Sequence, residues 1–208
     1  MGFYLEGLLN PINDEQEVFA GFRIGLLARY MISQSIGVQF EPGYHQLQGL
    51  NMYSKLRQDA IYDFGLNTQV YAMKANTAHF VSFPVSLTYQ TEKHGFELGY
   101  DINYLLGVQG DVQEVTLQNM VNEPSGVRSA KVDQVVENVS NGWLDMSPFG
   151  STSNRLFAGY NYKVSNGFML GARAYYQPKS ILETPPSELT EQQFTKLLIG
   201  VQAKFVIE

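Results

Sequence analysis

The chain has 208 residues and a formal net charge of -6, and it contains no cysteine. An acidic chain is a poor partner for nucleic acid, because phosphate binding requires a basic surface. The missing cysteines exclude disulfides and thiolate metal sites. Charged residues make up only 16% of the chain, whereas Tyr and Phe each occur 13 times and Gly 19 times. This composition favours strands over helices, and the length fits one domain over residues 1–208.

Apolar and polar residues alternate with a period of two, which is typical of strands with two different faces. No apolar run approaches the roughly 18 residues that a transmembrane helix needs. No signal peptide precedes Phe3, which for an exported protein implies that a leader was removed. In chain order, the alternation predicts eight strands near residues 2–10, 18–31, 35–47, 78–90, 95–109, 154–164, 167–178 and 194–207.

The connections between these strands alternate between short and long. Short turns are expected at 32–34, 91–94 and 165–166, and long loops at 11–17, 48–77, 110–153 and 178–193. In an antiparallel arrangement, every short turn then falls at one rim, which is typical of membrane barrels. We therefore predict an all-β fold, namely an eight-stranded antiparallel up-and-down transmembrane β-barrel with short periplasmic turns and long extracellular loops.

The two faces of each predicted strand differ in chemistry. Between residues 95 and 109, Leu98 and Ile102 belong to an apolar face, while Glu97, Gly99 and Asp101 belong to the other face. A closed barrel satisfies every backbone hydrogen bond, so lipid tolerates its apolar exterior. Eight strands leave an interior just wide enough for side chains. We expect the apolar faces to point outward and the charged, glycine-rich faces inward.

Projecting the strands inward collects charges of both signs in one narrow space. Isolated buried charges are costly, so these side chains are expected to form ion pairs. We favour a salt-bridged plug that closes the lumen, because the interior is narrow. A gated pore is the alternative. The predicted lumen charge network comprises Glu6, Arg23, Arg29, Glu41, Glu97, Asp101, Arg155, Arg173, Lys196 and Lys204.

Residue patterns for catalysis or metal binding are not found. The three histidines, His45, His79 and His94, lack metal-ligand spacing. Glu97 and Asp101 share a face but stand roughly 13 Å apart along a strand, beyond the about 5–9.5 Å of paired-carboxylate mechanisms. We expect no enzymatic activity, no cofactor and no metal, and we keep a lipid-modifying enzyme that uses His45 or His79 as a minor alternative.

The predicted loop over residues 110–153 contains the only tryptophan of the chain. An apolar cluster in an exposed loop marks a partner surface. The same cluster is equally consistent with a loop that folds back and caps the barrel mouth. The side chains of this candidate partner loop are Trp143, Leu144, Met146 and Phe149.

Three segments resemble the third, fourth and fifth strands of PorT-like outer-membrane β-barrel domains. They are SIGVQFEPGYHQLQG (35–49), HFVSFPVSLTY (79–89) with Pro84 at the matching place, and GFELGYDINYLL (95–106). The resemblance implies a small outer-membrane barrel of Bacteroidota envelopes, and it brings no catalytic residues. Members of the family include a component of a protein-secretion system and barrels that end longer envelope-signalling chains. Residues 110–153 form a longer insertion than the family has.

Together these observations predict a non-enzymatic protein of the bacterial outer membrane that acts as an envelope scaffold, interaction or sensing module. Its expected surroundings are the lipid bilayer and lipopolysaccharide, with an envelope protein as a candidate partner at the loops, no nucleic acid, and a monomeric state. The alternatives are a soluble lipocalin-like barrel with an apolar interior, a secretion-system component, and the C-terminal barrel of a signalling protein.

Overall fold

The computed structural model describes residues 1–9, 20–55, 67–122, 127–146, 149–178 and 197–207. Within these ranges the regular elements are all strands, and no helix is long and apolar enough to cross a lipid bilayer. The strands are β1 (Gly2–Leu9), β2 (Ala20–Met31), β3 (Ile36–Phe40), β4 (Gly43–Lys55), β5 (Asn67–Gln90), β6 (His94–Asn122), β7 (Val127–Trp143), β8 (Thr152–Ser165), β9 (Phe168–Tyr176) and β10 (Leu197–Val206).

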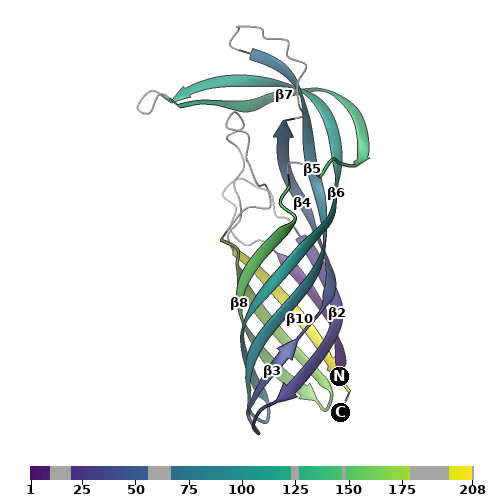
Figure 1. Cartoon of the computed structure of the whole chain (residues 1–208), viewed down its shortest axis with the longest axis vertical. Helices are drawn as coiled ribbons and strands as arrows, with labels where there is room; N and C mark the ends of the chain where they lie inside the picture. The colour runs from purple at the N-terminus through teal and green to yellow at the C-terminus, as the bar shows by residue number, and fades with distance from the viewer. Residues whose placement is uncertain (10–19, 56–66, 123–126, 147–148, 179–196, 208) are drawn as a thin grey trace.

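The strands pair antiparallel into a closed ring, which Figure 1 shows as the narrow lower part of the molecule. Closure is made by the first and last strands, with Phe3 opposite Phe205. In the described part of the chain the ring has eight positions, because β3 and β4 occupy one position in succession between β2 and β5. The predicted all-β antiparallel architecture is thus confirmed, and the ring leaves no open sheet edge along its length.

The break between β3 and β4 follows from Pro42, which has no backbone N–H to donate. Its carbonyl still accepts a hydrogen bond from Leu26 N at 2.9 Å. The chain therefore stays in its place beside β2 although the ladder is interrupted.

In this register, the outward-facing apolar residues of neighbouring strands lie opposite one another and form a continuous outer belt. Leu87 lies opposite Leu98, and Leu98 lies opposite Ala158. Because every second residue points outward, the same row continues around all eight positions. The row consists of Tyr30, Val38, Leu87, Leu98, Ala158, Ala174, Ile199 and Leu9.

The adjacent inward-facing row alternates large and small residues. Glu97 lies opposite Gly159, which lies opposite Arg173, and Arg173 lies opposite Gly200. Small barrels fill their interior by such alternation. The glycines therefore leave the space in which long charged side chains from next-but-one strands meet.

The short connections lie at one end of the ring, where both chain termini also lie (Figure 1). In the turn before β3, Ser33 Oγ accepts a hydrogen bond from Ile36 N at 3.1 Å. In the turn before β6, Thr91 Oγ1 accepts one from His94 N, also at 3.1 Å. Gly167 between β8 and β9 has a φ of 79°, a conformation that favours glycine.

Two of the predicted loops are largely strand instead. The pairing of β5 with β6 continues far beyond the ring, to Asn67 opposite Gln118, and β7 pairs with the outer half of β6. These strands project from the ring in Figure 1. The prediction of loops over 48–77 and 110–153 was wrong because register shifts, for example between Ala75 and Thr77, break the period of two in these strands. The backbone ladder persists although the apolar alternation is interrupted.

The end of the lumen toward the projecting strands is filled by apolar side chains. Leu8, Leu47, Phe80, Val108 and Leu198 from five ring strands are buried together. Leu144 and Phe149, which follow β7, join the same cluster. We call this layer the apolar cap, and it closes the ring interior on that side.

Substitution of Gly200 should be far more costly than substitution of Gly7. A Cβ at Gly200 would overlap the Glu6 carboxylate, whereas one at Gly7 meets nothing within 4 Å. Overpacking typically costs about 1–3 kcal/mol, so we expect Gly200→Val to lower the free energy of unfolding by that amount. Urea unfolding in detergent micelles measures it, with Gly7→Val as the matched control. Equal midpoints for both variants would contradict the inward packing.

Candidate functional site

The candidate site is the polar interior of the ring, and β10 passes through its layers. Leu198 belongs to the apolar cap. Gln202 and Lys204 are buried among charged side chains below the cap. Val206 lines a pocket at the short-turn end. The interior therefore consists of an apolar cap, a charged centre and an open mouth.

Two carboxylates and two cations form the half of the charged centre nearer the mouth. Arg173 donates from Nε to Glu97 Oε1 (2.6 Å) and from Nη2 to Glu97 Oε2 (2.8 Å). Arg173 Nη2 also pairs with Glu41. Lys204 Nζ lies 2.9 Å from a carboxylate oxygen of both Glu41 and Glu97. Each carboxylate is therefore shared by two cations, and the group of four is electrically balanced.

A second group lies between these residues and the apolar cap. Arg23 Nη2 lies 2.5 Å from Asp101 Oδ2, and Arg23 Nη1 lies 3.7 Å from Glu6 Oε2. Tyr175 donates its hydroxyl hydrogen toward the Glu6 carboxylate, with oxygen separations of 2.7 and 2.8 Å. The Arg23 guanidinium also stands 5.3 Å from the centre of the Tyr175 ring. Each of these four residues comes from a different strand.

Arg155 completes the charge balance of this second group. It lies opposite Asp101 in the register and donates from Nε to Gln177 Oε1 at 2.8 Å. Its Nη1 and Nη2 atoms have no protein partner, and neither do Asp101 Oδ1 and the two ring nitrogens of His45. Buried polar groups of this kind are commonly satisfied by internal water. With Arg155 included, the charged centre contains four cations and four carboxylates, counted over the described residues.

The two remaining members of the predicted network differ from these. Arg29 lies nearer the mouth and binds the amide oxygens of Gln39 and Gln90 rather than a carboxylate. Lys196 lies outside the described residues. The predicted residues that the structure brings together in the charged centre are Glu6, Arg23, Glu41, Glu97, Asp101, Arg155, Arg173 and Lys204.

Several polar residues of the interior were missed by the sequence analysis. Gln39 and Gln202 donate to Glu97, and Tyr4 donates to the backbone of Glu41. These side chains share the inward parity of the predicted charges on their own strands. The signal was therefore present, but a search restricted to charged residues passes over amides and phenols.

The four side chains of the candidate partner loop do not form one exposed surface. Leu144 and Phe149 are buried in the apolar cap, and Met146 packs against them. Trp143 alone is well exposed, at 66%, and its ring lies over Gly107 beside His79. Of the two interpretations of this segment, the structure favours the one in which the chain after β7 turns back over the lumen and buries its apolar side chains, and an exposed partner surface formed by all four needs correction.

The histidines do not converge on a common site. His45 is buried inside the ring, whereas His79 accepts or donates a hydrogen bond with Tyr44 at 2.6 Å on the other face of the sheet. His94 is exposed at the start of β6, and its Nδ1 lies 2.7 Å from the Tyr160 hydroxyl. Over the described ranges, no group of three or more His, Cys, Asp and Glu side chains is arranged to hold a metal ion.

Comparisons with known proteins give only a distant likeness. The sequence matches no protein-family model, and no curated protein matches it significantly. Ail, the attachment invasion locus protein of Yersinia pestis, is similar over 98% of this chain and 93% of its own. In complex with the heparin analogue sucrose octasulfate it is 11% identical with a TM-score of 0.38, and alone it is 12% identical with a TM-score of 0.36.

A mutant porin of Rh. blastica covers 98% of both chains at 9% identity, with a TM-score of 0.19. These scores are too low to carry a conclusion about topology or role. The predicted resemblance to PorT-like domains receives no support from these matches.

Removal of the Glu97 charge should destabilise the ring strongly. The variant Glu97→Gln leaves Arg173 and Lys204 with Glu41 as their one paired carboxylate, and breaking a buried ion pair costs about 3–5 kcal/mol. We expect a loss of that size in the free energy of unfolding, measured by urea titration in micelles.

The double variant Glu97→Gln with Lys204→Gln restores the charge balance and should recover at least half of the loss. Glu92→Gln, at an exposed turn, is the control and should leave the midpoint unchanged. If Glu97→Gln unfolds at the same urea concentration as this control, the network does not hold the ring together.

Proposed function

We propose that the protein is a β-barrel of the bacterial outer membrane that serves as a closed, non-enzymatic anchor for the strands projecting from it. The main support for the proposal is the distribution of side chains across the ring wall, which is the reverse of that in a soluble protein. Apolar side chains point outward and balanced charges point inward, which suits a barrel surrounded by lipid.

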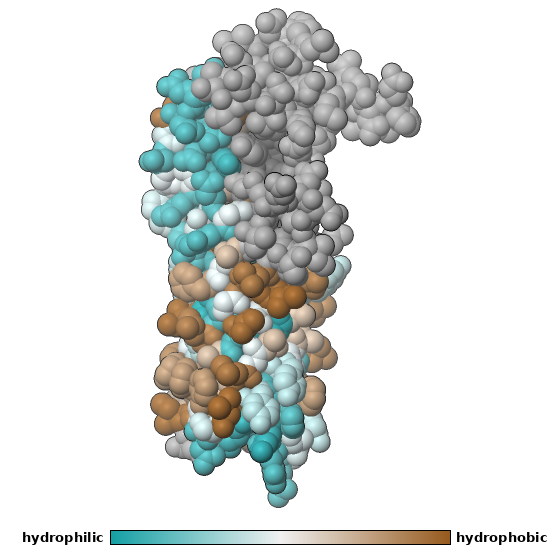
Figure 2. Space-filling view, turned by 180° about the vertical axis from the view of Figure 1, so that it is seen from behind, coloured by the Kyte–Doolittle hydropathy of each residue, from teal (hydrophilic) through white to brown (hydrophobic). Residues whose placement is uncertain are grey.

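The outer belt is too extensive for a wall that faces water. Soluble monomers rarely expose a contiguous apolar patch larger than a few hundred Å², whereas here the apolar row continues through all eight ring positions. Leu26 and Leu98 are each 67% exposed. On the face shown in Figure 2, hydrophobic residues cover the ring between hydrophilic regions at the short-turn end and on the projecting strands.

Aromatic side chains at both edges of the belt support a membrane position. Exposed rings near the short turns are those of Tyr30, Tyr89, Phe96, Tyr160 and Tyr162. Exposed rings toward the projecting strands are those of Phe22, Tyr104 and Trp143. Tyr and Trp favour the two interfaces of a bilayer. In this orientation the short turns face the periplasm, and the projecting strands reach past lipopolysaccharide to partners outside the cell.

The interior supports a plug rather than a pore. The charged centre joins side chains from opposite sides of the lumen through ion pairs, and the apolar cap lies directly above it. Two successive closed layers leave the projecting strands as the part available for contact with an envelope partner.

The lipocalin-like alternative requires the opposite polarity, with an apolar interior that binds its ligand. The charged centre of this ring holds eight charged side chains among the described residues, and the exterior is apolar. The alternative therefore has no support in the distribution of side chains.

The single tryptophan offers a direct test of membrane position. Trp143 lies at the belt edge toward the projecting strands, so insertion into vesicles should shift its emission to shorter wavelength. Lipids brominated near the headgroup should quench it more than lipids brominated near the end of the acyl chain. The double variant Trp143→Phe with Leu98→Trp moves the probe to the middle of the belt and should reverse that order.

The membrane proposal would be rejected if the protein were folded and monodisperse in buffer without detergent, and if brominated lipids quenched the tryptophan of neither the unmodified chain nor the double variant.

Conductance measurements test the closed lumen. Protein folded into a planar bilayer should show no sustained conductance steps, because the apolar cap and the charged centre both block the ring. Resistance of the same sample to unfolding by cold SDS confirms that it is folded. Regular steps from such a sample would contradict the plug and favour a pore.

A further inference from the structure

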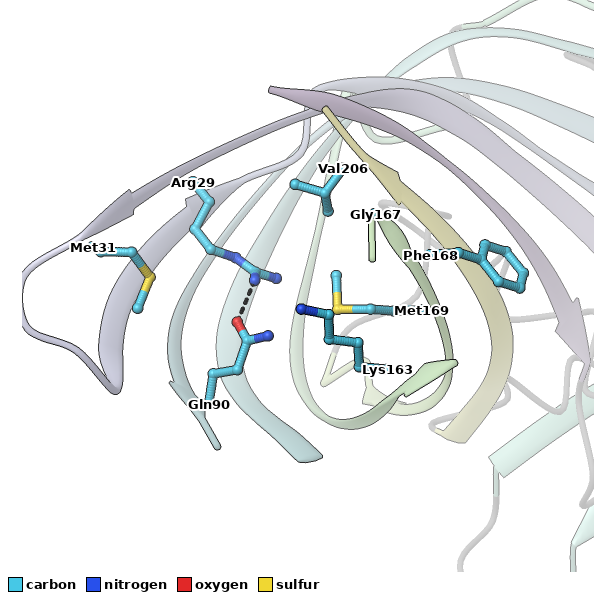
Figure 3. Close-up of a pocket in the computed structure, with 8 residues that line it drawn as sticks. All are labelled: Arg29, Met31, Gln90, Lys163, Gly167, Phe168, Met169 and Val206. Atoms are coloured by element: carbon cyan, nitrogen blue, oxygen red, sulfur yellow. Dashed lines mark hydrogen bonds between the residues drawn. The ribbon is translucent and has the colours of Figure 1, made fainter. Parts of the chain in front are cut away.

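The described part of the ring interior contains a pocket at the short-turn end. Its volume is about 230 Å³, and Figure 3 shows the side chains around it. Polar and apolar groups share the lining, and the principal ones are Arg29, Met31, Gln90, Lys163, Met169 and Val206. The pocket is blind, because the charged centre closes the lumen above it.

Arg29 is held in place across this pocket by neutral partners. It donates from Nε and Nη2 to Gln39 Oε1, at 3.0 and 2.6 Å, and from Nη1 to Gln90 Oε1 at 2.5 Å. A guanidinium has five N–H donors, so two remain for a ligand. The two amides orient the group without neutralising its charge.

Lys163 contributes a second positive charge from β8. Its side chain is half-buried, and its amine forms no hydrogen bond or ion pair with any other residue that the structure describes. In Figure 3 the amine points across the pocket toward Arg29 and Gln90. Two cations from different strands therefore face the same small space.

The charges of these two residues are not compensated within the described interior. The nearest inward-facing carboxylates, Glu41 and Glu97, are each already shared by Arg173 and Lys204. Because the charged centre holds equal numbers of cations and carboxylates, Arg29 and Lys163 are in excess. Glu92 lies exposed on the neighbouring turn.

We propose that this pocket binds a phosphoryl group, with Arg29 and Lys163 as its ligands. A phosphate monoester carries about -1.5 to -2 charges at pH 7, which matches two uncompensated cations. Arginine presents paired donors to phosphate oxygens, and lysine adds a point charge. The inference goes beyond the proposed function and needs only the ring, so it holds whether or not the barrel spans a membrane.

Calorimetric titration of the full chain with inorganic phosphate tests the proposal. The protein is kept at low salt in a maltoside detergent, which carries no phosphate of its own. We expect saturable binding to one site, weakened at least about tenfold by Lys163→Gln, because the variant loses a charge-assisted contact with the phosphate oxygens.

The matched control is Lys93→Gln, which removes the same charge from the adjacent turn. Lys93 is exposed, and its carbonyl accepts a hydrogen bond from Lys163 N at 2.8 Å. Binding to this variant should stay within a factor of two of the unmodified chain. Equal weakening by both substitutions would show a diffuse electrostatic effect and overturn the site, as would the absence of saturable binding to the unmodified chain.

A second titrant distinguishes the sources of the phosphoryl group. Short-chain phosphatidic acid that binds more than tenfold tighter than phosphate, and is displaced by phosphate, identifies a lipid headgroup. Comparable binding of both identifies a free phosphate compound.

Discussion

The pairing of buried charges across the lumen is the constraint on which the rest of the structure depends. Arg173 and Glu97 belong to strands that are not neighbours, and they meet because Gly159 lies between them. Charges held away from water must be paired, so the glycines and the long side chains have to alternate around the ring. A shift of one residue in any strand would turn its charges toward the outer belt. The network therefore specifies the register as well as filling the interior.

This constraint separates the molecule into parts with different roles. The charged centre and the apolar cap fill successive layers of the ring interior, and the outer wall is apolar. Beyond the ring, β5, β6 and β7 continue to pair with one another as an antiparallel ladder. Under the proposed function, we expect partners to contact these strands, because they can change in sequence without disturbing the ring.

At the mouth on the short-turn end, the described cations outnumber the carboxylates. Arg29 and Lys163 face a cavity without a carboxylate among the described side chains to pair with, although a few residues deeper every cation belongs to a balanced group. Uncompensated charge is unfavourable for the ring itself, so its presence beside an open volume indicates a role in binding rather than in stability.

The sequence by itself determined which side chains point inward and which point outward, because the parity of a strand is a local property. Residues such as Glu97, Arg173 and Leu98 were assigned correctly on that basis. Only the tertiary structure decided which charges meet, for example Arg23 with Asp101, since this depends on how far each strand is shifted along the ring. The strand character of β7 and the surplus cations at the mouth likewise escaped local patterns, and the sequence left the burial of Leu144 and Phe149 open beside an exposed partner surface. They arise from contacts between distant segments, and a period of two carries no information about those contacts.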